Sequence, residues 1–296
     1  MNITRRPYQA EDCQKVGQFL IEHYQPDNLD GNWLRPEWDY MHSHPSLDES
    51  ALERIGIWEE GGGIVAVAHY ESTLGEAFFQ CHPEYPFLKK ELLQYAEENL
   101  YQSDKGNKKL WIYCNDFDSE FESLLKAAGY HPLQKGMRPL SRLIIPSEIP
   151  EAELPEGFRI LSLADQNDLP RINHVLWRGF NHPGEPPREE EEGRKKMQSS
   201  PNFRKDLTIV AADPGGDFRA YCGFWVVVEK KYGLIEPLAT DPDFRRMGLA
   251  RTGVWEGVRR CRDLGAETIY VGSDQPFYLS LGFQVLYFTR AWALSV

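Results

Sequence analysis

Apolar and polar residues follow two distinct patterns along this chain. Short apolar runs broken by glycine-rich turns, as in IGIWEEGGGIVAVAHYES and LTIVAADPGGDFRAYCGFWVVV, predict β-hairpins. Other stretches space their apolar residues three to four positions apart, as Ala250, Val254, Val258 and Cys261 do, and predict amphipathic helices. The predicted order is a strand, helices, three strands, a helix, a strand, a short helix and further strands. This order indicates the α/β class with a mixed sheet.

The same order of elements occurs twice, at a nearly constant spacing. RPYQAEDCQKVGQFLIEHY and FRILSLADQNDLPRINHVLWRGF each read as a strand, a turn and a helix, with Asp12 and Asp168 as the expected caps. LWIYCNDFDSEFESLLKAAGY and TIYVGSDQPFYLSLGF each end in a glycine followed by an aromatic residue, at Gly129 and Gly282. Matches that recur in one order predict a duplicated domain.

The proline-rich, acidic stretch IPSEIPEAELPEGF separates the two copies and has the composition of a linker. We therefore predict a boundary near Pro150, with a first domain at residues 1–144, a linker at 145–157 and a second domain at 158–296. Each copy has an ordinary domain size.

One segment of the second copy, IEPLATDPDFRRMGLARTGVWEGV, carries candidate chemistry. It reads as a strand, a turn and a helix that begins close to Gly248. The first turn of a helix has unpaired N–H groups and a partial positive charge, and glycine allows close backbone approach. Arg245 and Arg246 add charge-assisted contacts to an anion. The segment predicts a site for a phosphate-rich ligand, although a solvated arginine pair beside a helix-starting glycine fits the letters equally well.

The wider context favours the binding site. A strand, D-P-x-aromatic-R-x-x-G-x-A, a long helix, a strand and F-Y-x-x-x-G-F together resemble the GNAT superfamily of acyl-CoA-dependent N-acyltransferases. The resemblance extends from Phe158 to about Trp292 and is most specific from Glu236 to Phe283. The first copy resembles the same fold with its signature eroded. The resemblance implies two GNAT-like domains, each with a mixed, mostly antiparallel twisted sheet, flanking helices and a splayed slot for the cofactor.

The resemblance also implies that acetyl-CoA is the cofactor. The segment from Arg245 to Ala250 would wrap the pyrophosphate, and the backbone of Leu238 and Thr240 would pair with the pantetheine arm like an added strand. Ser273 holds the place of a polar side chain that reaches the cofactor. The implied cofactor-binding residues are Leu238, Ala239, Thr240, Arg245, Arg246, Met247, Gly248, Leu249, Ala250 and Ser273.

Two residues are candidates for catalysis. Tyr278 stands at the position of the family's acid, where a phenol near the sulfur protonates the leaving thiolate, and the alternative is a tyrosine that packs the core. Glu236 stands where many members place the base, acting through water, and the alternative is a solvent-facing strand glutamate. A backbone N–H in the 238–240 stretch would stabilise the oxyanion.

The first copy lacks these features. Pro86 and Lys89 stand opposite Arg245 and Gly248, so a donor N–H is missing and a side chain stands where the backbone should approach a phosphate. Leu125 stands opposite Tyr278. We therefore predict that the first half has no coenzyme A site and is structural.

The favoured function is transfer of an acetyl group from acetyl-CoA to a primary amine of a small molecule, directly within a ternary complex. One alternative is an acyl-CoA sensor or regulatory protein without turnover. Another is an aminoacyl-tRNA-dependent transferase, which the intact pyrophosphate loop opposes. Trp177, Phe180 and His182 are candidate acceptor residues, although aromatic residues at this spacing more often pack a core and a histidine such as His182 more often lies in a surface loop.

Composition narrows the partners. The 296 residues carry a formal net charge of −12, which argues against nucleic acid as the main partner. The five cysteines form no C-x-x-C pair, so no metal site is expected. Neither an N-terminal apolar segment nor a long apolar run is present, so we expect a cytoplasmic protein without a membrane partner. An oligomer is possible.

Overall fold

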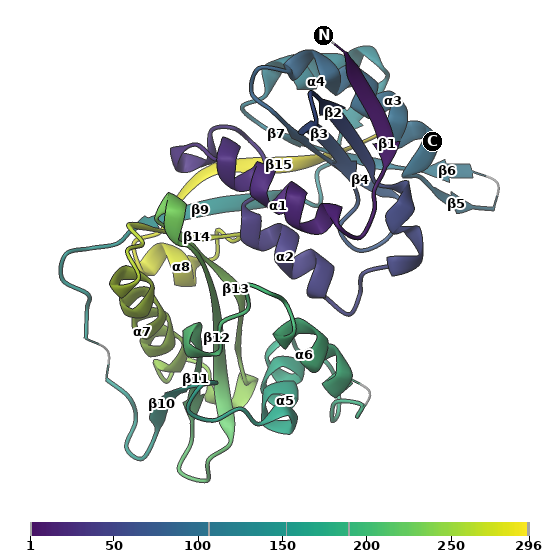
Figure 1. Ribbon diagram of the computed structural model, residues 1–296. Helices are drawn as coiled ribbons and strands as arrows, with labels where there is room; N and C mark the ends of the chain where they lie inside the picture. Colours follow the sequence, from purple (N-terminus) through teal and green to yellow (C-terminus); the bar gives the residue numbers. More distant parts are fainter. Residues whose placement is uncertain (1, 106, 152, 189, 295–296) are drawn as a thin grey trace. The chain divides into compact units, whose positions relative to one another are not determined.

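The computed structural model describes residues 2–105, 107–151, 153–188 and 190–294 (Figure 1). The chain forms two compact units. Unit 1 comprises Met1–His42, Ser46–Leu140 and Val285–Val296, and unit 2 comprises Ser43–Pro45 and Ser141–Gln284.

Unit 1 is a sheet with helices packed on it. Its strands pair in the order β1-β2-β3-β4-β7-β15, with β8 also on β15 and only β4 and β7 parallel. The elements are β1 Ile3–Pro7, α1 Asp12–His23, η1 Pro26–Asn28, α2 Arg35–Ser43, η2 Glu49–Arg54, β2 Gly56–Glu60, β3 Gly63–His69, β4 Glu76–Cys81, η3 Pro86–Leu88, α3 Lys89–Asn99, β5 Gln102–Asp104, β6 Asn107–Lys109, β7 Trp111–Asn115, α4 Ser119–Ala127, β8 Tyr130–Pro132, β9 Arg138–Ile144 and β15 Gln284–Leu294.

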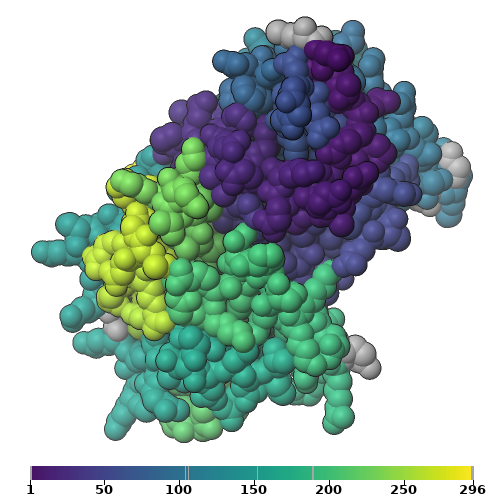
Figure 2. All heavy atoms as spheres, in the orientation of Figure 1, coloured from purple at the N-terminus to yellow at the C-terminus, as the bar shows by residue number. Residues whose placement is uncertain are grey.

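The core of unit 1 lies beneath the amphipathic faces of its helices. Helix α1 buries Val16, Phe19 and Leu20, which recur at the spacing of one helix face. Trp38 of α2 and Trp58 of β2 are fully buried in the same cluster. The purple segment that carries α1 and α2 covers much of the visible face of this unit, beside the blue atoms of later residues (Figure 2).

Unit 2 repeats this plan. Its strands pair in the order β10-β11-β12-β13-β14-β9, and only β13 and β14 are parallel. The elements are β10 Arg159–Ser162, α5 Leu169–Gly179, α6 Glu190–Gln198, η4 Lys205–Leu207, β11 Thr208–Ala212, β12 Phe218–Val227, η5 Val228–Lys230, β13 Tyr232–Thr240, η6 Pro242–Phe244, α7 Leu249–Asp263, β14 Thr268–Val271 and α8 Pro276–Ser280. Together the units confirm the predicted α/β class with a mixed, mostly antiparallel sheet.

Helices cover both faces of the sheet in unit 2. Alternate residues of β11 face opposite ways, so Ile209 joins the cluster under α7 while Val210 joins the cluster under α5. Glycine brings α7 close to β12, because a Cβ atom at Gly257 would lie 2.1 Å from the Phe224 ring. The helix that begins at the candidate loop is therefore fixed on the sheet.

Only one of the two predicted helix caps is confirmed. The Asp168 side chain accepts a hydrogen bond from the amide of Arg171 and caps α5. Asp12 is instead the first residue of α1, where it is buried against the guanidinium of Arg6 and accepts from the amide of Gln9. The ion pair with Arg6 compensates the burial of the Asp12 carboxylate.

The predicted domain boundaries differ from the observed units at the last strand of each copy. Val285–Val296 belong to unit 1, where residues 289–292 of β15 pair with β7, although residues 158–296 were expected to form one domain. Residues 141–144 of β9 belong to unit 2, where they pair with β14. The repeat pattern records the order of elements along the chain, but the choice of sheet edge depends on packing between residues distant in sequence.

The exchanged strand β15 makes a testable contribution to unit 1. Trp292→Ala removes an indole with 1% exposure from the core of unit 1. We expect the free energy of unfolding to fall by about 3–5 kcal/mol, measured by urea denaturation. Leu294→Ala, on the same strand but 50% exposed, is the control and should change it by less than about 0.5 kcal/mol. Hydrogen exchange should locate the loss in unit 1; equal effects of the two substitutions would contradict this assignment.

Candidate functional site

Strands β13 and β14 stop pairing midway along β13. They pair from Tyr232 to Ile235, and β13 then continues to Thr240 while β14 ends at Val271. The amide of Asp241 donates to β12, so the backbone groups of Thr240, one residue earlier, face the other edge. That edge borders a cavity of about 650 Å³. The splayed slot that the resemblance implied is present.

An irregularity on the other side of β13 accompanies the splay. The register between β12 and β13 shifts between Cys222 and Phe224. Gly223 lies against the carbonyl of Glu236, where a Cβ atom would come within 2.5 Å, and the Trp225 indole N–H donates to the same carbonyl at 2.9 Å. The peptide bond between Glu236 and Pro237 is cis. These contacts fix the backbone just before the open edge begins.

The loop between β13 and α7 closes one end of the cavity. Arg246 and Gly248 both adopt left-handed backbone conformations, with φ of 64° and 83°. Helix α7 begins at Leu249, and no side chain caps it at Gly248. Because the first-turn N–H groups of a helix have no partner within the helix, they present a row of donors and a partial positive charge beside the cavity. The loop therefore has the geometry of an anion site.

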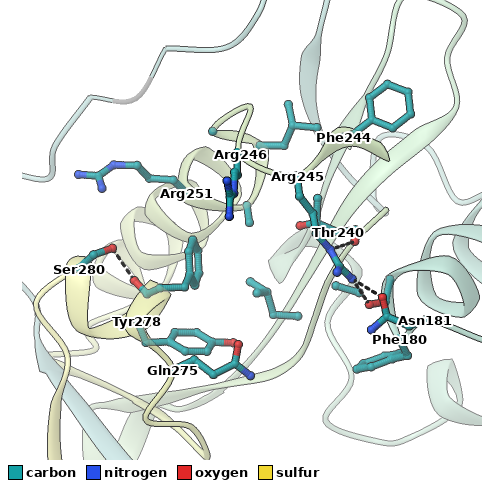
Figure 3. A pocket seen from close by; sticks show the side chains of 17 residues that line it. Phe180, Asn181, Thr240, Phe244, Arg245, Arg246, Arg251, Gln275, Tyr278 and Ser280 are labelled. Carbon is teal, nitrogen blue, oxygen red and sulfur yellow. Dashed lines mark hydrogen bonds between the residues drawn. The ribbon is translucent and has the colours of Figure 1, made fainter. Parts of the chain in front are cut away.

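The two arginines of this loop and Arg251 in the first turn of α7 have different contacts. Arg245 turns to the opposite wall, where its Nη2 donates to the carbonyl of Gly179 and to Oδ1 of Asn181, each at 2.9 Å, while its Nε donates to Thr240. Figure 3 shows the guanidinium of Arg246 directed into the cavity and Arg251 at its rim. In the described part of the chain, neither Arg246 nor Arg251 has a protein hydrogen-bond or ion-pair partner.

In the structure the Arg245 guanidinium contacts this wall, and its expected contact with an anion stays a prediction. Its guanidinium is occupied by the carboxyl end of α5, whose carbonyl groups carry partial negative charge. Arg251, which sequence reasoning missed, supplies a second open guanidinium beside that of Arg246. The available signal was its position in the first turn of α7, immediately after the Gly248–Ala250 segment.

Tyr278 lies on the short helix α8 and lines the cavity. It is 6% exposed, and its ring contacts Phe277 and Phe283 edge to face. Burial raises the pKa of the Tyr278 phenol above its ordinary value, and the nearby Cys222 and Glu236 raise it further. The phenol is consequently protonated at neutral pH and available as a donor.

The remaining predicted residues divide into two groups. Those that line the cavity are Leu238, Ala239, Thr240, Arg245, Arg246, Gly248, Leu249, Ala250 and Tyr278. Met247, Ser273 and Glu236 are absent from the lining that the described residues form. Met247 is 37% exposed, and the Ser273 hydroxyl accepts from the amide of Gln275 at 3.3 Å. Glu236 is half-buried and close enough to influence the pKa of Tyr278.

Several lining residues lie far from the signature in sequence. The carboxyl end of α5 contributes Phe180, which is 50% exposed, while Trp177 and His182 stack on each other at 4.4 Å outside the lining. The lining residues that sequence reasoning did not assign to the cofactor site are Gly179, Phe180, Asn181, Phe244, Arg251, Gln275, Phe277 and Ser280. The α5 residues reach the cavity only through tertiary packing.

Unit 1 has different chemistry at the matching helix start. Lys89 begins α3, and its ammonium group forms an ion pair with Asp118 and lies 5.7 Å from the Phe121 ring centroid. Leu125, opposite Tyr278, is fully buried in the core. The ammonium group at this helix start therefore already has partners within unit 1.

Comparisons with known proteins agree with this geometry. Residues 169–283 match the model of the Acetyltransferase (GNAT) family. The chain is 24% identical to a mycothiol acetyltransferase from Saccharopolyspora erythraea, over 100% of this chain and 99% of that protein. Among solved structures, a GCN5-related N-acetyltransferase from Sphaerobacter thermophilus has a TM-score of 0.65 at 17% identity, covering 98% of this chain and 95% of that chain. A tandem GNAT protein from the clavulanic acid biosynthesis pathway has a TM-score of 0.66 at 13% identity, covering 99% and 98%.

Residues 169–283 match the GNAT acetyltransferase family, so the second half of the chain is similar to GNAT-type acyltransferases. Over its full length the chain is similar to a mycothiol acetyltransferase, and its fold is that of tandem GNAT structures. Across the described residues, no helix combines the length and apolarity that a membrane span requires, and no cluster of three or more potential metal ligands is found.

Proposed function

We propose that unit 2 binds acetyl-CoA in this cavity and transfers the acetyl group directly to a primary amine of a small molecule. The observation that carries the proposal is one cavity bordered by an open strand edge, an uncapped helix start and a protonated phenol. Each of these three features matches one part of the cofactor: the pantetheine amides, the diphosphate and the thiol.

The residues in place fit the cofactor. The amides around Gly248 and the guanidinium groups of Arg246 and Arg251 would hold the diphosphate. The backbone of Leu238 and Thr240 would pair with the pantetheine arm like an added strand. Arg245 fixes the loop to the end of α5 and so shapes the cavity in which the diphosphate would be held.

Bound acetyl-CoA supplies the acetyl group as an activated thioester. A neutral amine forms the new C–N bond as the C–S bond breaks, and the amine loses a proton that Glu236 would accept through water. An amide of the 238–240 stretch would stabilise the negative charge that develops on the carbonyl oxygen. Tyr278, whose phenol is protonated at neutral pH, would give its proton to the departing thiolate or hydrogen-bond to it.

The acceptor belongs to the proposal only as a chemical class. The full-length relative is called a mycothiol acetyltransferase, which supports an acetyl-transfer reaction on this two-unit architecture. The wall formed by Phe180 and Asn181 borders the same cavity, and we propose that the amine approaches across it.

The diphosphate site can be tested by calorimetry with coenzyme A. Arg246→Ala removes an open guanidinium from the cavity, and we expect the dissociation constant to rise about tenfold, roughly 1.4 kcal/mol. Arg262→Ala, in the last turn of the same helix and outside the lining, is the control and should bind like the wild type. The absence of binding by the wild-type chain would remove the basis of the proposal.

The acid role can be tested by turnover. Tyr278→Phe should lower kcat by about 10²-fold or more while leaving coenzyme A affinity close to the wild-type value. Because the pKa of the phenol is raised, wild-type activity should show no decline from phenol ionisation through about pH 9. Tyr221→Phe, buried under α5 on the other face of the sheet, is the control.

Product assays with acetyl-CoA and a panel of amines provide the readout. Unchanged kcat in Tyr278→Phe would make the tyrosine a packing residue. Cofactor binding with no product from any amine would favour the sensor over the enzyme.

A further inference from the structure

Unit 1 has the same splay in its sheet as unit 2. Strands β4 and β7 pair only at Glu76 and Ala77, and β4 then continues to Cys81. The amide of His82 donates to the carbonyl of Val65 in β3, so the backbone groups of Cys81, one residue earlier, face the opposite edge. The amide of His82 donates to β3, and the amide of Asp241 donates to β12, the strand at the corresponding position in unit 2. Cys81 therefore corresponds to Thr240.

A segment of the chain itself lies at this edge. The Asn32 side-chain amide donates to the carbonyl of Cys81 at 3.1 Å, and its Oδ1 accepts from the amide of Cys81 at 2.6 Å. This two-bond pairing is the one that a peptide-like amide makes with an exposed strand edge. Asn32 is 3% exposed, so the pair is closed to solvent.

The same segment also contacts the second splayed strand. The carbonyl of Gly31 accepts from Nδ2 of Asn115, at the end of β7, at 2.8 Å. A side chain at Gly31 would come within 2.9 Å of that nitrogen, and its φ is 75°, so glycine is required there. The segment therefore bridges the two strands that diverge.

Polar and aromatic contacts seat the segment further. The amide of Trp33 donates to Oε1 of Gln80 at 2.6 Å, and the Trp33 ring contacts Phe78 edge to face at 4.9 Å. Nε2 of Gln80 lies 2.8 Å from Nε2 of His69, whose other nitrogen faces a carbonyl. Burial lowers the pKa of His69 to about 3, so the ring is neutral and accepts the Gln80 hydrogen bond.

The segment is also anchored on the exchanged strand β15. Asn28 is 1% exposed, and its Nδ2 donates to the carbonyl of Asn32 and to the Tyr287 hydroxyl, each at 2.7 Å. The segment is thus tied to β4, β7 and β15 of unit 1.

We propose that residues 28–33 are an internal occupant of the vestigial pantetheine slot of unit 1, with the Asn32 carboxamide in the place of a cofactor amide. The slot is occupied permanently by the chain, so unit 1 keeps the GNAT fold without the cofactor. Two independent features would then prevent cofactor binding in unit 1. One is the lysine, Lys89, at the helix start, and the other is the segment of residues 28–33 in the slot. The comparison with unit 2 rests on the proposed function, whereas the occupant of unit 1 is read from unit 1 alone.

Residue-resolved hydrogen exchange of the full chain tests the proposal. In the free protein, the Cys81 amide should exchange at least about tenfold more slowly than the Thr240 amide, because only Cys81 has a buried partner at the slot edge. Saturating coenzyme A should slow exchange at residues 238–240 and leave residues 78–81 unchanged. Comparable fast exchange of Cys81 and Thr240 in the free protein, or a response of residues 78–81 to coenzyme A, would overturn the proposal.

A substitution isolates the Asn32 contact. Asn32→Leu keeps a similar volume and removes both hydrogen bonds, and Cys81 exchange should rise at least about tenfold. Asn167→Leu, at a side-chain pair with Gln198 in unit 2, is the control and should leave Cys81 exchange unchanged. A folded Asn32→Leu chain with wild-type protection at Cys81 would contradict the assignment, and if this variant does not fold, the wild-type comparison decides. A failed response at residues 238–240 would count against the proposed function only.

Discussion

The interrupted pairing of β13 and β14 is the constraint on which the candidate site depends. Four residues of each strand pair, and β13 then runs on toward Thr240 with its backbone facing a cavity. Backbone N–H and C=O groups in a protein interior require partners, so an open strand edge inside a cavity defines a place for a peptide-like ligand. Helix α7 starts beside this edge without a side-chain cap. One break in the sheet thus places an open strand edge and an uncapped helix start beside the same cavity.

The splayed strand edge has different surroundings in the two units. In unit 2 the backbone edge at Leu238 and Thr240 borders an open cavity. In unit 1 the matching edge at Cys81 is paired with the side chain of Asn32. In unit 1, an internal side-chain amide thus meets the hydrogen-bonding requirement of the splayed strand.

Local features of the site could be predicted from the sequence, and features set by tertiary packing could not. The helix start at Gly248 was predictable because a glycine precedes apolar residues at helical spacing. The position of Tyr278 was predictable because the short motif around it resembles a known family. The engagement of Arg245 by α5 was not predictable, since Gly179 and Asn181 are distant in sequence. The same limit applies to β15. Its sequence pattern predicted a strand but could not predict that this strand joins the sheet of unit 1.

The most direct test of the account is a crystal structure of the full chain soaked with acetyl-CoA. We expect a single cofactor, with its diphosphate at the amides around Gly248 and its pantetheine arm along Leu238 and Thr240. We also expect the Asn32–Cys81 pair to stay intact in the same crystal. A diphosphate seated beside Lys89, or a pantetheine arm that displaces residues 28–33, would contradict the central claim that only the second unit has an open slot.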